Sequence, residues 1–101
     1  PEQPIRIIIE SPTEIDVDVG TSVRFVCRAV SYSDEATYVL SWTMNGSGLP
    51  LKAIDQNGVL VIPNIQPEDA GTYTCTGSDP TGVDRATAII RVGGMFRIFI
   101  L

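Results

Sequence analysis

Two cysteines, one lysine and no histidine are the starting inventory for any chemistry in this chain. Histidine is the commonest general base and the commonest metal ligand, so its absence removes the usual routes to hydrolysis and to a zinc site. Cys27 and Cys75 are too few to build a zinc site, and they supply at most one disulfide. Lys52, the only lysine, has no neighbours that would activate it as a base. We therefore expect no enzyme, no catalytic residue, no metal and no cofactor.

The segment Asn45-Gly46-Ser47 matches the acceptor sequence for N-glycosylation. An Asn-Gly pair is also a strong signal for a hairpin turn, where an attached glycan would be exposed to solvent. Asn57-Gly58 is a second such pair and predicts a turn only, because it lacks the Ser or Thr of the acceptor sequence. Two interpretations stay open. Either Asn45 carries a glycan, which requires secretion, or the pair serves turn geometry alone.

Three acidic residues, Glu14, Asp16 and Asp18, alternate with apolar residues along one predicted strand. Their side chains would project from the same face, about 7 Å apart. Such a stripe could attract Ca²⁺, but that ion takes six or more oxygens from converging segments, and no calcium-type loop accompanies the stripe. We predict instead a solvated face whose charges discourage edge-to-edge pairing of sheets.

The chain has 101 residues and a net charge of −5, which is the length of one acidic domain. An acidic chain is a poor match to phosphate backbones, heparin-like polyanions and anionic membrane surfaces, so no nucleic-acid partner is expected. The longest apolar run, residues 95–101, falls well short of the roughly 20 residues of a membrane-spanning helix, so no membrane insertion is expected. The first residues look like an opened linker, which suggests an excerpt from a longer protein.

Apolar residues alternate at period two along most of the chain, and turn residues interrupt them about every 8–12 residues. Each strand then has one buried and one wet face, and two such sheets pack face to face. The pattern predicts an all-β antiparallel sandwich of about seven to eight strands. Strands are expected at residues 6–10, 14–19, 23–28, 38–44, 59–62, 73–77 and 86–92. The polar loop at 31–36 is either a contact surface or a simple connection.

Four features converge on one pattern. Cys27 and Cys75 occupy inward positions of two predicted strands, and Trp42 occupies another inward position between them. Asp69-x-Gly71-x-Tyr73-x-Cys75 forms a continuous corner motif. Over about residues 5–92 this pattern resembles the immunoglobulin fold. The resemblance implies a Greek-key sandwich with one disulfide between its sheets.

The resemblance also implies roles for the remaining residues of the pattern. Trp42 would pack on the disulfide, and the hydroxyl of Tyr73 would bond back to the chain. Gly71 would permit a tight backbone at the corner. Many family members pair the corner Asp69 with a basic residue; Lys52 is the only cation of that stretch here, and whether the two pair stays open.

The length of one segment and two short sequence motifs, or phrases, indicate the subfamily. The short segment between Trp42 and Val59 leaves little room for the extra strands of antibody variable domains, which favours the intermediate (I-set) class. The phrases Gly48-Leu49-Pro50 and Cys75-Thr76-Gly77-Ser78 look most like the immunoglobulin repeats of basement-membrane heparan sulfate proteoglycans of the perlecan type.

This resemblance implies a structural and protein-interaction module of a secreted, multidomain matrix proteoglycan. Its partners would be other matrix or cell-surface proteins and neighbouring modules of the same chain. Two alternatives remain: a ligand-binding or homophilic module of a cell-surface receptor or adhesion molecule, and an intracellular muscle-filament module with reduced thiols. The domain is expected to occupy residues 1–93, and the apolar tail at 94–101 is either a linker or an artificial extension.

Overall fold

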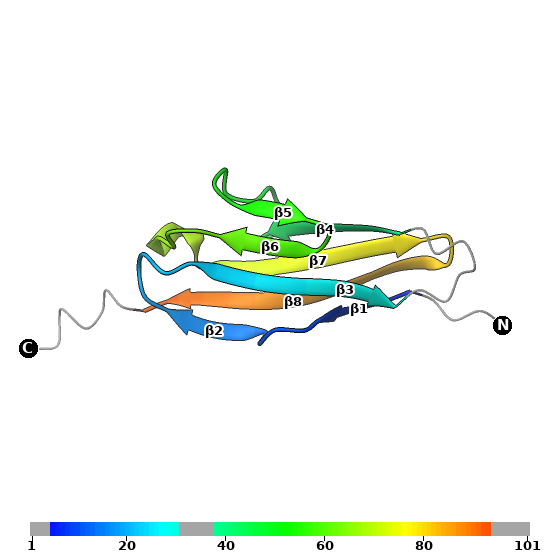
Figure 1. Cartoon of the computed structure of the whole chain (residues 1–101), viewed down its shortest axis with the longest axis horizontal. Coiled ribbons are helices and arrows are strands. Elements are labelled where there is room, and N and C mark those ends of the chain that lie inside the picture. The colour runs from blue at the N-terminus through cyan, green and yellow to red at the C-terminus, as the bar shows by residue number, and fades with distance from the viewer. Residues whose placement is uncertain (1–4, 31–37, 94–101) are drawn as a thin grey trace, which may run out of the picture.

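Eight strands and one short 3-10 helix make up the part of the chain that the computed structural model describes, residues 5–30 and 38–93. The strands run along the long axis of the molecule (Figure 1), and the predicted all-β class is confirmed. The candidate contact loop at 31–36 and the tail at 94–101 lie outside the described residues. The elements are β1 (Arg6–Ile9), β2 (Glu14–Val17), β3 (Val23–Val30), β4 (Val39–Met44), β5 (Ile54–Gln56), β6 (Val59–Ile62), η1 (Pro67–Asp69), β7 (Gly71–Asp79) and β8 (Gly82–Val92).

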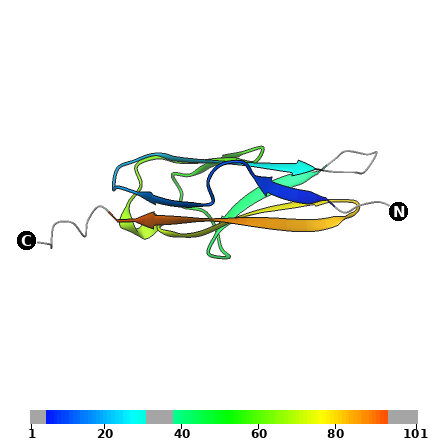
Figure 2. The ribbon, with the colours of Figure 1, turned by 90° about the horizontal axis from the view of Figure 1, so that it is seen from below.

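The strands form two four-stranded sheets, which face each other as two layers (Figure 2). One sheet has the order β1-β3-β6-β5 and the other β2-β8-β7-β4, so the chain passes repeatedly between the layers, as the predicted sandwich requires. One pair departs from the predicted antiparallel order, because β2 runs parallel to β8. The chain crosses to the second sheet after β1, and β2 therefore arrives beside β8 in the same direction.

The core lies between the layers and is built from alternate residues of facing strands, as the period-two pattern predicted. Two apolar residues of the predicted strands at 14–19 and 38–44 are more exposed than this alternation suggests: Val19 is 40% exposed and Tyr38 is 43% exposed. Val19 follows the end of β2 and Tyr38 precedes the start of β4, so both lie outside the strands of the structure. The buried apolar residues are Ile5, Ile7, Val23, Phe25, Cys27, Trp42, Leu60, Ile62, Ile65, Tyr73, Cys75, Ala88 and Ile90.

Both predicted Asn-Gly turns are present. Asn45 and Gly46 have φ values of 51° and 79°, and the turn is closed by hydrogen bonds between Met44 and Ser47. Asn57 and Gly58 have φ values of 52° and 88° and join β5 to β6. Two consecutive residues with positive φ match the twist of the strands that they connect.

Strand β1 lies at the edge of its sheet, and two of the amides in and next to it are bonded by side chains of the other sheet. Thr81 Oγ1 accepts the N–H of Ile5 at 3.1 Å, and Asp84 Oδ2 accepts the N–H of Ile7 at 2.8 Å. We call these four residues the β1 clamp. Edge amides otherwise present a template for strand addition, so the clamp both fastens β1 and covers this edge.

Strand β4 is an edge of the second sheet, and a carboxylate covers its backbone as well. Asp55 on β5 accepts the N–H of Trp42 through Oδ2 at 2.9 Å. The other carboxylate oxygen of Asp55 is buried and has no hydrogen-bond partner among the described residues. One side chain of the first sheet thereby fastens the edge of the second.

The hydrogen bond from Ile7 changes the acidity of Asp84. The carboxylate accepts the Ile7 amide and also the amide of Arg85, and both bonds lower the pKa of Asp84 below its ordinary value. Burial opposes this shift in the pKa, and the nearby charges of Arg6 and Arg85 lower the pKa further by smaller amounts. A carboxyl group with a lowered pKa in the folded state stabilises the fold above its unfolded pKa of about 3.9 and loses that contribution as the pH falls through the folded value.

The Asp84→Ala variant should therefore be less stable than the wild-type chain at neutral pH, by about 1 kcal/mol, because Ile7 loses a charged acceptor. The difference should shrink as the pH is lowered from about 5 to about 2, since the wild-type carboxyl is then protonated as well. Urea unfolding followed by tryptophan fluorescence across this pH range measures the difference.

Asp16→Ala is the matched control, because it removes the same charge from an exposed position on β2. Its effect should stay within about 0.5 kcal/mol. A stability difference for Asp84→Ala that does not change with pH would contradict the assigned role of the carboxylate.

Candidate functional site

A disulfide between Cys27 on β3 and Cys75 on β7 joins the two sheets. The two Cα atoms are 6.5 Å apart, and both side chains are buried. The inter-sheet disulfide that the resemblance implied is therefore present.

Trp42 lies beside this disulfide. It stands opposite Cys75 in the register of β4 and β7, and its side chain is buried in the core. Its ring stacks on that of Phe25, with centroids 5.7 Å apart and planes 22° apart. The indole N–H donates to the carbonyl oxygen of Gly58 at 2.9 Å, so the polar atom of the ring is satisfied inside the core.

The carbonyl of Gly58 serves two donors. It accepts the N–H of Cys27 at 2.9 Å in addition to the indole N–H. A Cβ at Gly58 would overlap with the carbonyl oxygen of Cys27 and would lie 2.8 Å from Leu40 Cδ1. The β5–β6 turn can therefore approach β3 this closely only because residue 58 has no side chain, and its φ of 88° independently favours glycine.

Tyr73, in the corner motif, lies on β7 and is buried in the core. Its hydroxyl donates to the backbone oxygen of Asp69 at 2.7 Å, and its ring is fully buried. Burial, and secondarily the negative charge of Asp69, raises the pKa of Tyr73 to about 12. The phenol is therefore held as a neutral hydrogen-bond donor.

Asp69 itself is 2% exposed and is paired with Lys52 at 2.5 Å. The same carboxylate oxygen accepts the N–H of Gln66 at 2.8 Å, and the ammonium of Lys52 also donates to the carbonyl of Asn64 at 2.8 Å. The structure thus forms the pairing that the sequence left open. A buried carboxylate needs such partners, because an unpaired charge in the core is costly.

Asn45, the predicted glycan acceptor, is hydrogen-bonded to Thr72 through its backbone N–H and through its side-chain oxygen. Its N–H donates to the oxygen of Thr72 at 2.7 Å, and its Oδ1 accepts the N–H of Thr72 at 3.0 Å. The side chain lies against Gly71, where a Cβ would stand 2.9 Å from Nδ2, the atom to which an N-glycan is attached. Asn45 is exposed, so the residue is both anchored and accessible.

Two acidic residues of β2 form ion pairs with one arginine of β8. Arg91 contacts Glu14 at 2.5 Å and Asp16 at 3.8 Å, and the Glu14 carboxylate raises the pKa of Arg91. Within residues 5–30 and 38–93, no group of three or more His, Cys, Asp or Glu side chains is arranged to hold a metal ion.

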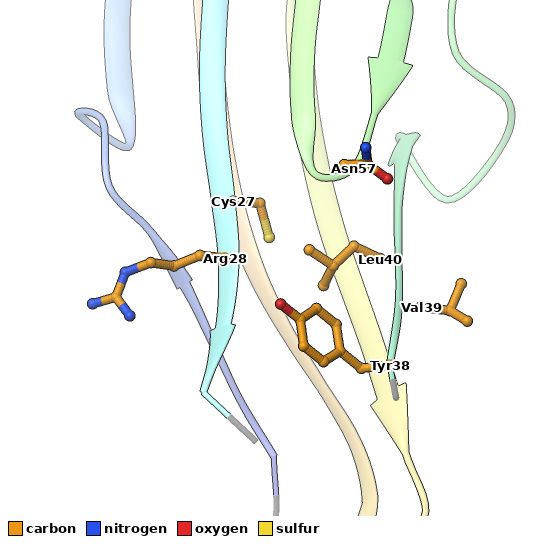
Figure 3. A pocket seen from close by; sticks show the side chains of 6 residues that line it. All are labelled: Cys27, Arg28, Tyr38, Val39, Leu40 and Asn57. Atoms are coloured by element: carbon orange, nitrogen blue, oxygen red, sulfur yellow. The ribbon is translucent and has the colours of Figure 1, made fainter. Parts of the chain in front are cut away.

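A pocket of about 490 Å³ opens between β3 and β4. In Figure 3, Tyr38 and Leu40 point toward Cys27, whereas Arg28 and Val39 point away from the pocket. The lining described by the structure contains one cation and no carboxylate, so it offers no acid–base pair for catalysis. The lining residues are Cys27, Arg28, Tyr38, Val39, Leu40 and Asn57.

Comparisons with known proteins agree with this geometry. The family model of the immunoglobulin domain matches residues 6–78. The chain belongs to the immunoglobulin family. The basement membrane-specific heparan sulfate proteoglycan core protein of Mus musculus is 44% identical over 91% of the chain. The mouse MAM domain-containing glycosylphosphatidylinositol anchor protein 2 is 35% identical over 77% of it. The crystal structure of the N-terminal four Ig domains of Dscam1 isoform 1.9 superposes with a TM-score of 0.73 over 89% of the chain, at 24% identity.

This immunoglobulin domain spans only a small part of each of these proteins. It covers 2% of the mouse proteoglycan, 8% of the anchor protein and 21% of the Dscam1 chain. The described residues include no helix long and apolar enough to cross a membrane. In each case the similarity is to one part of a much longer protein.

Several residues that organise the immunoglobulin domain were not singled out by sequence reasoning. The sequence pattern predicts Gly58 only as half of a turn, and it gives no sign that Thr81, Asp84 and Asp55 accept backbone amides at the sheet edges. Each acts on a residue far away in sequence, so no local pattern pointed to it. The positive φ of an Asn-Gly turn was predictable, but the closeness of Gly58 to Cys27 was not.

Substituting Gly58 with Ala should destabilise the immunoglobulin domain by about 3 kcal/mol or more, because a Cβ both strains the backbone and collides with the Cys27 carbonyl. Denaturant unfolding under non-reducing conditions measures the loss. Gly46→Ala is the matched control, since Gly46 has a similar positive φ but no atom within 4 Å of its would-be Cβ.

Gly46→Ala should cost only the conformational strain, about 1–2 kcal/mol. Equal losses of unfolding free energy in the two variants would show that the collision of a Cβ at residue 58 with the Cys27 carbonyl adds nothing to the destabilisation.

Proposed function

We propose that this domain is a structural and protein-interaction module of a secreted, multidomain proteoglycan of the basement membrane. The observation that carries the proposal is the 44% identity, over 91% of the chain, to the mouse basement membrane-specific heparan sulfate proteoglycan core protein. The module contributes no catalysis in this proposal. It acts as a spacer that displays surface for other matrix or cell-surface proteins.

The arrangement of the strands supports a place in a tandem array. Strand β1 begins toward one end of the long axis, and β8 ends toward the other (Figure 1). Neighbouring modules would then attach at opposite ends of a stiff sandwich whose sheets are tied by a disulfide. Strand β8 ends at Val92, in keeping with a domain at residues 1–93 and a linker or artificial extension at 94–101.

A second candidate is an immunoglobulin module of a cell-surface protein. The 35% identity to the mouse glycosylphosphatidylinositol anchor protein favours it specifically. The two candidates differ in the parent chain rather than in the fold, because both call for an oxidised, extracellular sandwich.

Treatment of the parent protein with two enzymes separates these candidates. An antibody against the 101-residue chain would detect the parent in tissue extracts before and after digestion with heparan sulfate lyase. For a proteoglycan, the lyase should convert a diffuse, slowly migrating band into a sharp, faster one. Digestion with phosphatidylinositol-specific phospholipase C should leave the parent in the matrix fraction.

Release of the parent from membranes by the phospholipase, with no effect of the lyase, would favour the cell-surface module. Recovery of the parent only with intracellular filaments, with Cys27 and Cys75 reduced, would overturn both extracellular candidates in favour of the muscle-filament module.

We also propose that Asn45 carries an N-linked glycan in the secreted protein. The side chain uses Oδ1 to accept the Thr72 amide, which leaves the attachment of a sugar at Nδ2 compatible with that hydrogen bond. The absence of a side chain at Gly71 keeps the neighbouring space open. A glycan at this position would lie at the end of β4, next to the first residues of β7.

Expression of the chain through the secretory pathway of mammalian cells tests this site. The secreted chain should lose mass on digestion with peptide N-glycosidase F. Ser47→Ala should abolish the shift, and Ser47→Thr should retain it, while both keep Asn45 and its bonds to Thr72. Secretion of the wild-type chain without a glycan would leave Asn45 with its turn role alone.

A further inference from the structure

The segment from Ile5 to the end of β1 is held in part by side chains from the opposite side of the sandwich. Its amides at Ile5 and Ile7 are held by the side chains of Thr81 and Asp84, which belong to the opposite sheet and to its β7–β8 turn. Its only ladder is with β3, over four register pairs. The β1 clamp thus consists of side-chain contacts, which can release without disturbing a second ladder.

The acceptor at Thr81 is set by its own turn. The Thr81 N–H donates to Asp79 Oδ1 at 2.7 Å, and the Thr81 hydroxyl donates to the same oxygen in a short hydrogen bond. Because the hydroxyl proton is directed to Asp79, the oxygen lone pairs of Thr81 are free to receive the amide of Ile5. The turn itself therefore orients the Thr81 hydroxyl toward the amide of Ile5.

An apolar contact accompanies these hydrogen bonds. Ile7 is buried, and its Cδ1 occupies the space where a Cβ of Gly77 would stand. Gly77 on β7 therefore provides a socket for Ile7, and Ile5 is buried as well. The two hydrogen bonds and the packing of Ile7 against Gly77 together hold this short segment against β7, β8 and the turn between them.

Release of β1 would leave the remaining fold largely connected. The chain crosses to the second sheet after β1, and β2 keeps its own register pairs with β8. The disulfide, Trp42 and the Gly58 carbonyl lie in elements other than β1. Release of β1 would therefore withdraw Ile5 and Ile7 from the core but leave the disulfide, Trp42 and the Gly58 carbonyl in place.

We propose that residues 5–9 form a strap that opens as a unit of its own, held by the β1 clamp, while the disulfide-linked sandwich stays folded. Opening would free five residues, which extend by about 16 Å when stretched. If the domain is one module of a tandem array, as proposed above, opening of the strap would allow the distance between neighbouring modules to change. That consequence rests on the proposed function, whereas the opening itself does not.

Native-state hydrogen exchange of the isolated 101-residue chain tests the proposal, with the Ile5, Ile7 and Cys27 amides followed by NMR. The Cys27 amide, bonded to Gly58, reports the core. In the wild-type chain, the Ile5 and Ile7 amides should be protected yet exchange at least about tenfold faster than Cys27. Their exchange should also depend less on denaturant than that of Cys27, since local opening exposes little surface.

Substitutions within the clamp should act on the strap alone. Asp84→Ala should speed exchange of Ile7 relative to Cys27 by about tenfold, and Thr81→Val, which preserves shape, should speed that of Ile5 by about fivefold. Asp84→Asn retains an oxygen acceptor and should restore most of the protection of Ile7. Asp16→Ala, which removes an equal charge from β2, should change neither ratio.

Two results would overturn the proposal. Exchange of Ile5 and Ile7 at the rate of Cys27, with every clamp variant shifting all three amides equally, would mean that β1 opens only with the whole domain. Exchange of both amides at the rate of an unstructured peptide would mean that no clamp holds them. Because the measurement uses the isolated domain, neither result bears on the proposed function. A failed lyase test likewise does not bear on the proposed opening of the strap.

Discussion

The carbonyl of Gly58 is the point on which the interior of this domain depends. It accepts the indole N–H of Trp42 and the amide of Cys27, and so links the largest core side chain to the strand that carries the disulfide. Burying an indole without an acceptor would carry a desolvation penalty, and a turn displaced by one side chain could not supply that acceptor. The turn lies so close to β3 that a Cβ at Gly58 would stand 2.4 Å from the carbonyl oxygen of Cys27, and the indole that it binds also stacks on Phe25.

The acidic residues of the domain have a structural use that its net charge alone does not indicate. Asp84, Asp55 and Asp69 each accept a main-chain amide, from Ile7, Trp42 and Gln66 in turn. The first two of these amides belong to edge strands, where a sandwich otherwise presents unpaired donors. Asp84 and Asp55 therefore fasten edge strands, and Lys52 neutralises Asp69, whose carboxylate is buried in the core.

Membership of the immunoglobulin family explains the scaffold of the domain. Among the described residues, the pocket between β3 and β4 is lined by one cation and no carboxylate, and no group of side chains is arranged to hold a metal ion. The proposed strap and the proposed glycan sit on separate parts of the fold. Strap opening involves β1 and the β7–β8 turn, whereas the glycan would follow β4.

Local sequence predicted the strands other than β5, the two Asn-Gly turns and the inward positions of the cysteines and Trp42, because each of these depends on alternation or on residue type within a few positions. The family pattern then indicated the disulfide and the corner at Tyr73. Only the tertiary structure decided that Lys52 meets Asp69, that β2 runs parallel to β8, and that Asp84 and Thr81 hold the amides of Ile7 and Ile5. These contacts join residues from separate strands and turns, and their geometry follows from how the two layers are stacked, which no local pattern encodes.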